Sequence, residues 1–232
     1  MEGVSTVLHI ASITSSRIII EAAIKKNVKW VILVHTTGRY SKYKSASKEY
    51  IEIEDWVLSK RDLIAITVIR PTMIYGSSMD RNMYKLIDYL YKHKYFPLFG
   101  SGKNLMQPVY AKDLGYAYYD VLINKENTFN KEYNLAGKNP IRYIDLIAQV
   151  TLALKKQNVI IKIPLWFSIT AARVYNKLTK SPMISVEQVL RMQEDKAFSY
   201  EEATNDFGFS PTSFEEGIIL EVAEYLNSIA KR

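Results

Sequence analysis

The chain of 232 residues is long enough for one large domain, and its 48% hydrophobic content allows a sizeable core. It contains no cysteine, which excludes disulfides, thiolate metal ligands and a thiol nucleophile. The formal net charge is +7, but the lysines are scattered along the sequence rather than gathered in one basic tract, so we expect no nucleic-acid partner.

Two further classes are disfavoured by the sequence. No apolar run approaches the roughly 18–20 residues of a membrane span, and the first residues lack the basic-then-apolar layout of a signal peptide. We therefore expect no membrane partner and take a cytoplasmic location as the default. The histidines His9, His35 and His93 are scattered and have no clustered carboxylates, so the sequence predicts no metal site.

The first third of the chain alternates between strand and helix patterns. Short apolar runs predict strands, and apolar residues at helical spacing predict helices between them. The predicted elements, in order, are strand Ser5–Ala11, helix Ser16–Lys26, strand Val31–Val34, helix Lys44–Ser59 and strand Leu63–Ile69. This order makes two βαβ units, and so it predicts an α/β fold with a parallel sheet.

Beyond Pro71 the pattern is looser and mainly helical. The predicted helices are Asp80–Lys92, Asp113–Ile123, Tyr143–Leu154, Leu165–Leu178 and Ser185–Gln193. The predicted strands are Leu105–Tyr110, Glu132–Leu135 and Val159–Ile163, with a glycine-bearing loop at Phe96–Asn104. Ser213 followed by Glu216 forms a capping box, which predicts a last helix running to about Ala230.

The stretch Trp30–Lys48 carries the densest group of candidate functional residues. An apolar run ends at Thr36 and Thr37, a glycine follows, and tyrosines then alternate with lysines. A buried parallel strand that ends in this way brings polar groups to the carboxyl edge of the sheet, where open α/β sheets bind their ligands.

Five motifs occur along the chain in a characteristic order. They are Val7–Ser12, Glu21–Val31, Ile69–Gly76 with its Arg-Pro and Tyr-Gly pairs, Gln107–Leu114, and Tyr133–Gly137. This series resembles the extended short-chain dehydrogenase/reductases, the NAD-dependent epimerase/dehydratase family. The resemblance implies a single Rossmann-like domain with a small, mostly helical substrate lobe. Core strands would lie mainly in residues 1–76 and the lobe mainly in residues 77–232.

The chain departs from the resemblance at its start. It opens on what resembles the family's fourth strand, and its nine glycines do not form the G-x-x-G-x-x-G turn that holds a pyrophosphate. We therefore expect the C-terminal portion of a doubly wound domain, lacking the N-terminal glycine-rich part. A truncated form and a gene start placed at an internal methionine would both account for this pattern.

The second departure concerns the catalytic pair. The resemblance implies a tyrosine and a lysine four residues apart on one helix, where the cation favours the phenolate for acid/base work. Lys48 follows the family-like Ala-Ser, but Lys44 stands four residues before it, and Tyr43 is five before, about 140° away round a helix. Tyr40 and Lys44 have the literal spacing, although Tyr40 follows Gly38 closely, where the helix has not necessarily begun.

The resemblance also implies site residues at three strand ends. The catalytic candidates are Thr36, Tyr40, Tyr43, Lys44 and Lys48, with Thr36 holding a substrate oxygen. The candidates for binding NAD or NADP are His9, Ala11, Ser12, Thr37, Arg70, Pro71, Thr72 and Tyr75. The loop Gly100–Lys103 lacks the full phosphate-loop pattern, and we expect it to cover a substrate cleft with Lys103 or Gln107 facing an anionic group.

Two functions remain open from the sequence. The first is an NAD(P)-dependent epimerase, dehydratase or reductase that acts by hydride transfer on a sugar nucleotide or a similar hydroxylated small molecule, with a tyrosine as acid/base. The second is a non-catalytic member that serves as a dinucleotide sensor or an assembly scaffold. Fold alone does not decide between them. A homodimer is compatible with both functions.

Overall fold

The computed structural model describes residues 1–80, 82–178 and 186–230. Its chain forms two compact units. The first unit comprises residues 1–72, 112–136 and 198–211, and the second comprises the described residues of 73–111, 137–197 and 212–232. We expected the core strands mainly in residues 1–76, and the first unit also takes in two later segments, 112–136 and 198–211.

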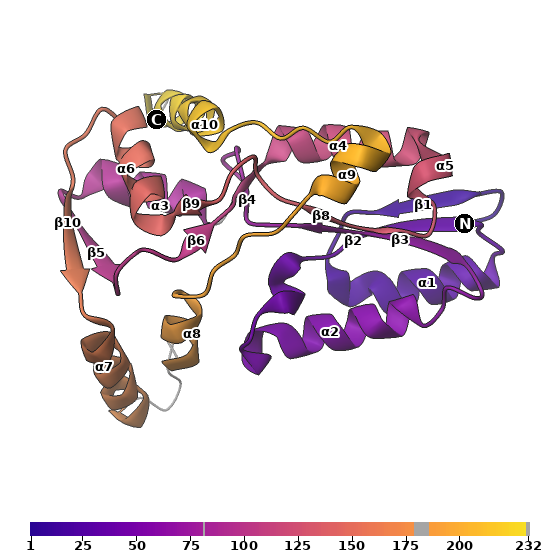
Figure 1. Cartoon of the computed structure of the whole chain (residues 1–232), viewed down its shortest axis with the longest axis horizontal. Helices are drawn as coiled ribbons and strands as arrows, with labels where there is room; N and C mark the ends of the chain where they lie inside the picture. The colour runs from indigo at the N-terminus through magenta and orange to yellow at the C-terminus, as the bar shows by residue number, and fades with distance from the viewer. Residues whose placement is uncertain (81, 179–185, 231–232) are drawn as a thin grey trace. The chain divides into compact units, whose positions relative to one another are not determined.

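The first unit is built on a four-stranded parallel sheet with the order β1-β2-β3-β8 (Figure 1). The strands are β1 (Thr6–His9), β2 (Trp30–Val34), β3 (Ala65–Pro71) and β8 (Glu132–Leu135). The α/β class and the parallel sheet are therefore confirmed. The predicted strand Leu63–Ile69 begins later, at Ala65, because the side chain of Leu63 is exposed.

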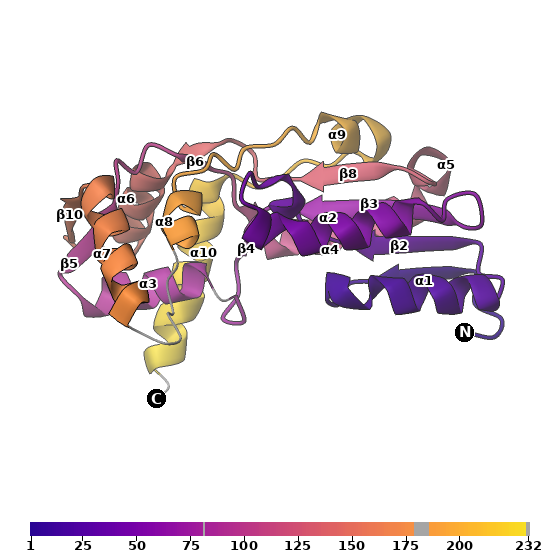
Figure 2. The same cartoon turned by 90° about the horizontal axis from the view of Figure 1, so that it is seen from below.

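Helices cover both faces of this sheet. Within the first unit these are η1 (Ile13–Ser15), α1 (Ser16–Lys25), η2 (Thr37–Tyr40), α2 (Lys44–Leu58), α4 (Ala111–Ile123), α5 (Lys125–Thr128) and α9 (Glu201–Phe207). The helices α1 and α2 lie on one face, and α4 and α9 lie on the other (Figures 1 and 2). Every residue of β2 and β3 is buried, as expected for parallel strands with both faces covered.

One core of the first unit lies between the sheet and the helices α1 and α2. Alternate strand residues point toward these helices, and the helical residues that meet them recur at helical spacing. The buried members are Ile13, Ile20, Ala23, Val28, Val31, Leu33, Ile53, Val57, Ile64, Ile66 and Val68. This packing fixes the carboxyl ends of β2 and β3, where the candidate residues lie.

The second unit has a helical core and three small two-stranded sheets. The helices are α3 (Met83–Lys92), α6 (Tyr143–Ala153), α7 (Leu165–Leu178), α8 (Val186–Arg191) and α10 (Phe214–Ala230). The sheets pair β4 (Ile74–Tyr75) with β7 (Val109–Tyr110), β5 (Tyr95–Phe99) with β10 (Val159–Ile163), and β6 (Leu105–Met106) with β9 (Ile141–Arg142). Buried residues of α3, α6 and α10 form one hydrophobic cluster.

The structure corrects several expected elements. The segment Phe96–Asn104 is not wholly a loop, because its first part lies in β5 and pairs with β10, about sixty residues later. The expected strand Leu105–Tyr110 is split into β6 and β7 at Gln107 and Pro108, since proline offers no backbone N–H to a ladder. The helices α5 and α9 were not predicted, and Ser185 lies outside the described residues.

The capping box before the last helix is confirmed. The Ser213 hydroxyl accepts a hydrogen bond from the Glu216 backbone N–H at 3.3 Å, and the Glu216 carboxylate accepts one from the Ser213 N–H at 3.2 Å. The two bonds satisfy backbone donors that the first helical turn leaves without partners. The helix α10 ends at Ala230, as predicted.

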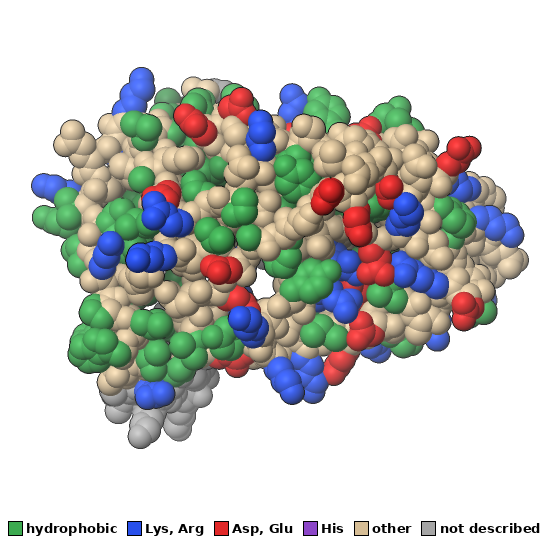
Figure 3. All heavy atoms as spheres, viewed as in Figure 1, with side chains coloured by type: hydrophobic (Ala, Val, Ile, Leu, Met, Phe, Trp, Pro, Cys, Tyr) green, Lys and Arg blue, Asp and Glu red, His purple; other side chains and the backbone are tan. Residues whose placement is uncertain are grey.

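Among the helices of residues 1–80, 82–178 and 186–230, none is long and apolar enough to cross a membrane. Some large apolar side chains are nevertheless exposed on the second unit. Figure 3 shows hydrophobic side chains gathered over α7, where Trp166 and Phe167 are 69% and 54% exposed. The helix predicted over Leu165–Leu178 is present as α7.

Candidate functional site

Hydroxyl groups follow β2 at the carboxyl edge of the sheet. Thr36 is the N-cap of η2, and its Oγ1 accepts a hydrogen bond from the Gly38 N–H at 3.0 Å. The hydroxyl proton of Thr36 is not used by this bond and can be donated to a ligand. Thr37 is buried, and its Oγ1 donates to the Pro71 carbonyl at 3.2 Å. Thr37 therefore ties the end of β2 to the end of β3.

Tyr40 is the last residue of η2 and is 45% exposed. Its Oη lies 3.4 Å from the Oδ1 of Asn134, so the phenol reaches the end of β8. The guanidinium carbons of Arg39 and Arg70 each lie 5.8 Å from the centre of its ring, and the ring of Phe198 lies 5.4 Å away. An exposed phenol at the carboxyl edge is thus held by two arginines and an aromatic ring.

The lysine candidates do not share this position. The helix α2 begins at Lys44, whereas η2 ends at Tyr40, so the Tyr40–Lys44 spacing does not place the two side chains on one helical face. Tyr43 has an extended backbone and caps α2. Lys44 and Lys48 are exposed, and the amine of Lys48 lies 3.8 Å from Glu52.

A buried group of charged side chains lies directly behind Tyr40. The carboxylate of Glu54 is fully buried and accepts hydrogen bonds from Arg70 at 2.6 and 2.8 Å, from Arg39, and from His35 at 2.8 Å. Arg70 also forms an ion pair with Glu132, the first residue of β8. Because an unpaired buried charge is very costly, each member of this group depends on the others.

His35 is neutral in this environment. Burial, followed by the positive charges of Arg70, His9 and Arg39, lowers the pKa of His35 to about 3. The negative charge of Glu54 does not reverse this direction, because two guanidinium groups already share its carboxylate. The neutral ring therefore donates from Nδ1 to Glu54 and accepts at Nε2.

The acceptor nitrogen of His35 receives the hydroxyl of Ser16, with 3.0 Å between Ser16 Oγ and His35 Nε2. The order serine, histidine, glutamate resembles a hydrolase triad in its connections. Ser16, however, is fully buried in the first turn of α1. A nucleophile must meet its substrate, so we assign this chain of hydrogen bonds to fixing α1 and α2 on the sheet.

The cofactor candidates near β1 lie at the end of that strand. The Nε2 of His9 lies 3.2 Å from the Ser12 carbonyl, so the His9 ring braces the exit of the strand. Ser12 and Ala11 are exposed, and the Ser12 hydroxyl accepts from the Thr14 N–H at 3.3 Å. These residues are accessible to a ligand at the carboxyl edge.

The turn after β3 is divided between the two units. Arg70 binds Glu54 and Glu132, and the Thr72 N–H donates to the Leu135 carbonyl at 3.0 Å. Tyr75 lies in the second unit, where its side chain is fully buried and its ring is 5.2 Å from that of Phe214. These contacts hold Arg70 and Tyr75 in the fold, and the cofactor-binding role expected for Arg70, Pro71, Thr72 and Tyr75 stays a prediction.

The sequence reasoning did not single out Glu54, His35 or Asn134 as neighbours of Tyr40. One signal for Glu54 was present, because Arg70 is the charged residue of the buried strand β3 and a buried arginine requires a carboxylate partner. No local pattern connects Asn134 with Tyr40, since 94 residues separate them in the chain.

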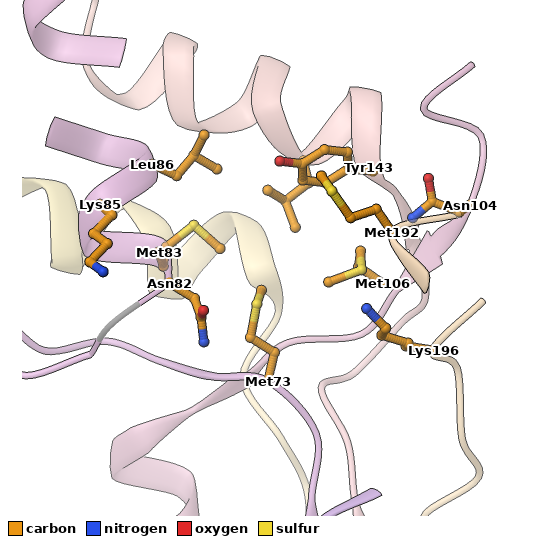
Figure 4. A pocket seen from close by; sticks show the side chains of 11 residues that line it. Met73, Asn82, Met83, Lys85, Leu86, Asn104, Met106, Tyr143, Met192 and Lys196 are labelled. Carbon is orange, nitrogen blue, oxygen red and sulfur yellow. The ribbon is translucent and has the colours of Figure 1, made fainter. Parts of the chain in front are cut away.

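The second unit contains a pocket of its own, with a volume of about 440 Å³ (Figure 4). Its lining residues are Met73, Asn82, Met83, Lys85, Leu86, Asn104, Met106, Tyr143, Leu146, Met192 and Lys196. Gln107, which we expected to face an anionic group, is buried and donates from Nε2 to the Gly137 carbonyl at 2.7 Å. Lys103 is exposed.

No family model and no curated protein sequence matches this chain. Solved structures match it over nearly its whole length. A protein designated gox2253 covers 98% of this chain and 80% of its own, with 14% identity and a TM-score of 0.78. The UDP-glucose 4-epimerase of Thermotoga maritima, solved with UDP-glucose, covers 97% and 78%, with 17% identity and a TM-score of 0.69.

The dTDP-glucose 4,6-dehydratase DesIV of Streptomyces venezuelae, solved with NAD and TYD, covers 99% of this chain and 76% of its own. Its identity is 14% and its TM-score is 0.72. At such identities the likeness shows the fold, which is a Rossmann-like α/β fold of the kind found in epimerase/dehydratase-type enzymes.

Proposed function

We propose that this chain binds NAD or NADP and is an oxidoreductase of the epimerase/dehydratase kind, acting on a hydroxylated small molecule such as a sugar nucleotide. Support comes from the fold, because neighbours of this fold include a UDP-glucose epimerase and an NAD-bound dTDP-glucose dehydratase. Further support comes from polar side chains at the carboxyl edge of the parallel sheet, where such folds bind ligands.

The observation that carries the proposal is the position of Tyr40. Its phenol is exposed at this edge, and its Oη is within reach of Asn134, whose amide orients it. In the proposed reaction Tyr40 takes or returns the proton of the substrate hydroxyl at Oη, and the hydroxyl of Thr36 donates to the same substrate oxygen. The guanidinium groups of Arg39 and Arg70 lie against the ring and fix its position.

The residues present fit a dinucleotide in part. Ser12 and Ala11 are exposed at the end of β1, so a hydroxyl and backbone groups there can bind a ribose or an amide. The sequence contains no glycine-rich pyrophosphate turn. The chemistry that a nicotinamide supplies when bound is reversible hydride transfer to a carbon that bears a hydroxyl group.

Calorimetric titration with NAD, NADP and their reduced forms tests binding, and NMR of UDP-glucose and dTDP-glucose incubated with the protein tests turnover. We expect Tyr40→Phe to bind the dinucleotide as the wild type does but to lower kcat by about 10²–10⁴-fold, the usual contribution of general acid/base catalysis. Tyr119→Phe removes an exposed tyrosine from α4 and serves as the matched control. Unchanged turnover in Tyr40→Phe, or its loss in Tyr43→Phe alone, would contradict the role of Tyr40.

The alternative is a non-catalytic dinucleotide sensor or scaffold. It is favoured by the exposure of Lys44 and Lys48, which leaves the usual tyrosine–lysine pair unassembled. The same titration discriminates between the two functions. Dinucleotide binding without turnover of any hydroxylated substrate supports the sensor, and the absence of binding to any dinucleotide contradicts both.

A further inference from the structure

The pocket of the second unit has a predominantly apolar wall built from four methionines (Figure 4). They come from distant parts of the sequence: Met73 precedes β4, Met83 begins α3, Met106 ends β6, and Met192 follows α8. Methionine is unbranched and polarisable, so a wall of this composition adapts to flexible or irregular apolar groups. The rest of the lining is mixed, with Leu86 and Leu146 beside the polar side chains of Asn82, Lys85, Asn104, Tyr143 and Lys196.

One polar group in this wall lacks a partner. Asn104 is only 8% exposed and lines the pocket, and among the described residues its Oδ1 has no hydrogen-bond partner. A buried amide oxygen without a donor is costly, and native proteins rarely retain one without a reason. A ligand that donates a hydrogen bond would satisfy it.

The side chain of Lys196 lines the same pocket as Asn104. The Leu105 N–H donates to Asp195 at 2.7 Å, and the Lys196 N–H donates to the Leu105 carbonyl at 2.8 Å. These two bonds fix Lys196 beside the strand that Asn104 precedes, and its amine points into the pocket (Figure 4).

The amine of Lys196 makes no ion pair with any described residue. Burial, followed by the charge of Arg191, lowers the pKa of this amine, and Glu194 opposes the shift only in part. A half-buried ammonium group without a counter-ion is a receptor for an anion.

We propose that this pocket binds an organic acid with an apolar body, whose carboxylate pairs with Lys196 and whose neighbouring hydroxyl donates to Asn104. The four methionines and Leu86, Leu146 and Tyr143 hold the apolar body. A medium-chain 3-hydroxy acid has this combination of groups. This proposal concerns binding alone and does not depend on the proposed function.

The test uses the 232-residue protein labelled with ¹³C at the methionine methyl groups, observed by NMR while 3-hydroxydecanoate, decanoate or UDP-glucose is added. We expect 3-hydroxydecanoate to shift the signals of Met73, Met83, Met106 and Met192. Met79 is 85% exposed and does not line the pocket, so its signal serves as an internal control. Decanoate lacks the hydroxyl and should bind about tenfold more weakly, in keeping with one lost hydrogen bond.

Two variants test the polar contacts. Lys196→Met keeps the length of the side chain and removes its charge, and Asn104→Leu removes the amide. Each should raise the Kd for 3-hydroxydecanoate at least tenfold. Lys162→Met, an exposed lysine on β10, should leave it unchanged.

Three outcomes would overturn the proposal: shifts of Met79 together with the other methyl groups, unchanged affinity in Lys196→Met, or shifts of the pocket methyl groups by UDP-glucose but not by the hydroxy acid. The calorimetric titration with dinucleotides is scored separately. If no dinucleotide binds in that titration, the proposed function is contradicted. The result of the methionine NMR experiment on this pocket is not affected.

Discussion

Glu54 is fully buried, and the side chains of Arg39, Arg70 and His35 all bind its carboxylate. Such a group seldom improves stability over an apolar core, but removing one member leaves the others charged and unpaired. Arg70 ends a buried strand, and its place in the sequence suggested a ligand contact. Its actual partner, on α2, was set by tertiary packing, because nothing local selects Glu54 over the other acidic residues of that helix.

We predict that Glu54→Gln lowers the free energy of unfolding by about 3–5 kcal/mol, because the guanidinium groups of Arg39 and Arg70 lose the charge that balances them. The measurement is urea denaturation followed by circular dichroism. Glu52→Gln, two residues earlier on the same helix, changes an exposed carboxylate 3.8 Å from Lys48 and should cost less than about 1 kcal/mol. Equal losses of stability in the two variants would show that the buried charged group does not depend on the charge of Glu54.

Glu221 is a second buried carboxyl group, on α10. Its Oε2 accepts a hydrogen bond from the Gly76 N–H at 3.0 Å. Burial, followed by the hydrogen bond and the charge of Asp80, raises the pKa of Glu221 to about 9. The folded state therefore holds a proton that the unfolded state releases above its ordinary pKa of 4.5.

A raised carboxyl pKa contributes stability that is complete below the unfolded pKa and is lost as the pH rises toward the folded pKa. We predict that the wild type loses up to about 3 kcal/mol from this group between pH 5 and pH 7. Glu221→Gln keeps an oxygen that can accept from the Gly76 N–H but does not titrate, so its stability should depend less on pH. Glu224→Gln, an exposed neighbour that accepts from the Ser78 N–H, should keep the wild-type slope. The measurement is denaturation across this pH range, and identical slopes for wild type and Glu221→Gln would refute the assignment.

Helices and strands with strong local patterns lie where the sequence predicted them. The helices α1, α2 and α6 end within a residue or so of the expected positions, because apolar spacing and burial agree there. The strand β5 was expected as a loop, since its glycine-rich continuation dominates the local pattern. Its strand character comes from pairing with β10, which no short window contains.

Two helical glycines offer a test at this scale. A Cβ added at Gly217 in α10 would lie 2.1 Å from the Oη of Tyr75, a fully buried side chain, whereas one added at Gly115 in α4 would meet nothing within 4 Å. We predict that Gly217→Ala lowers stability by about 1–3 kcal/mol through overpacking. Gly115→Ala should instead raise it by about 0.5–1 kcal/mol through helix propensity. Thermal denaturation of both variants gives the comparison, and a stabilising Gly217→Ala would mean that α10 does not pack closely on Tyr75.

At the scale of the molecule, the chain leaves the first unit after Thr72, builds part of the second, and returns with α4, α5 and β8. The strand β8 pairs with β3 and brings Asn134 and Glu132 to the edge of the sheet. A division that puts the core strands mainly in residues 1–76 does not by itself show that Glu132 lies beside Arg70 or Asn134 beside Tyr40.

The sequence by itself determined the α/β class, the parallel order of the first strands, the helices between them and the hydroxyl groups at the end of β2. These features follow from local apolar periodicity and from the short connections that βαβ units require. Three features were decided by the tertiary structure alone. Tyr40 contacts Asn134 rather than Lys44, Arg70 forms an ion pair with Glu54, and four methionines line one pocket. Those contacts join residues tens of positions apart, and their energies depend on burial and pairing, which a linear pattern does not specify.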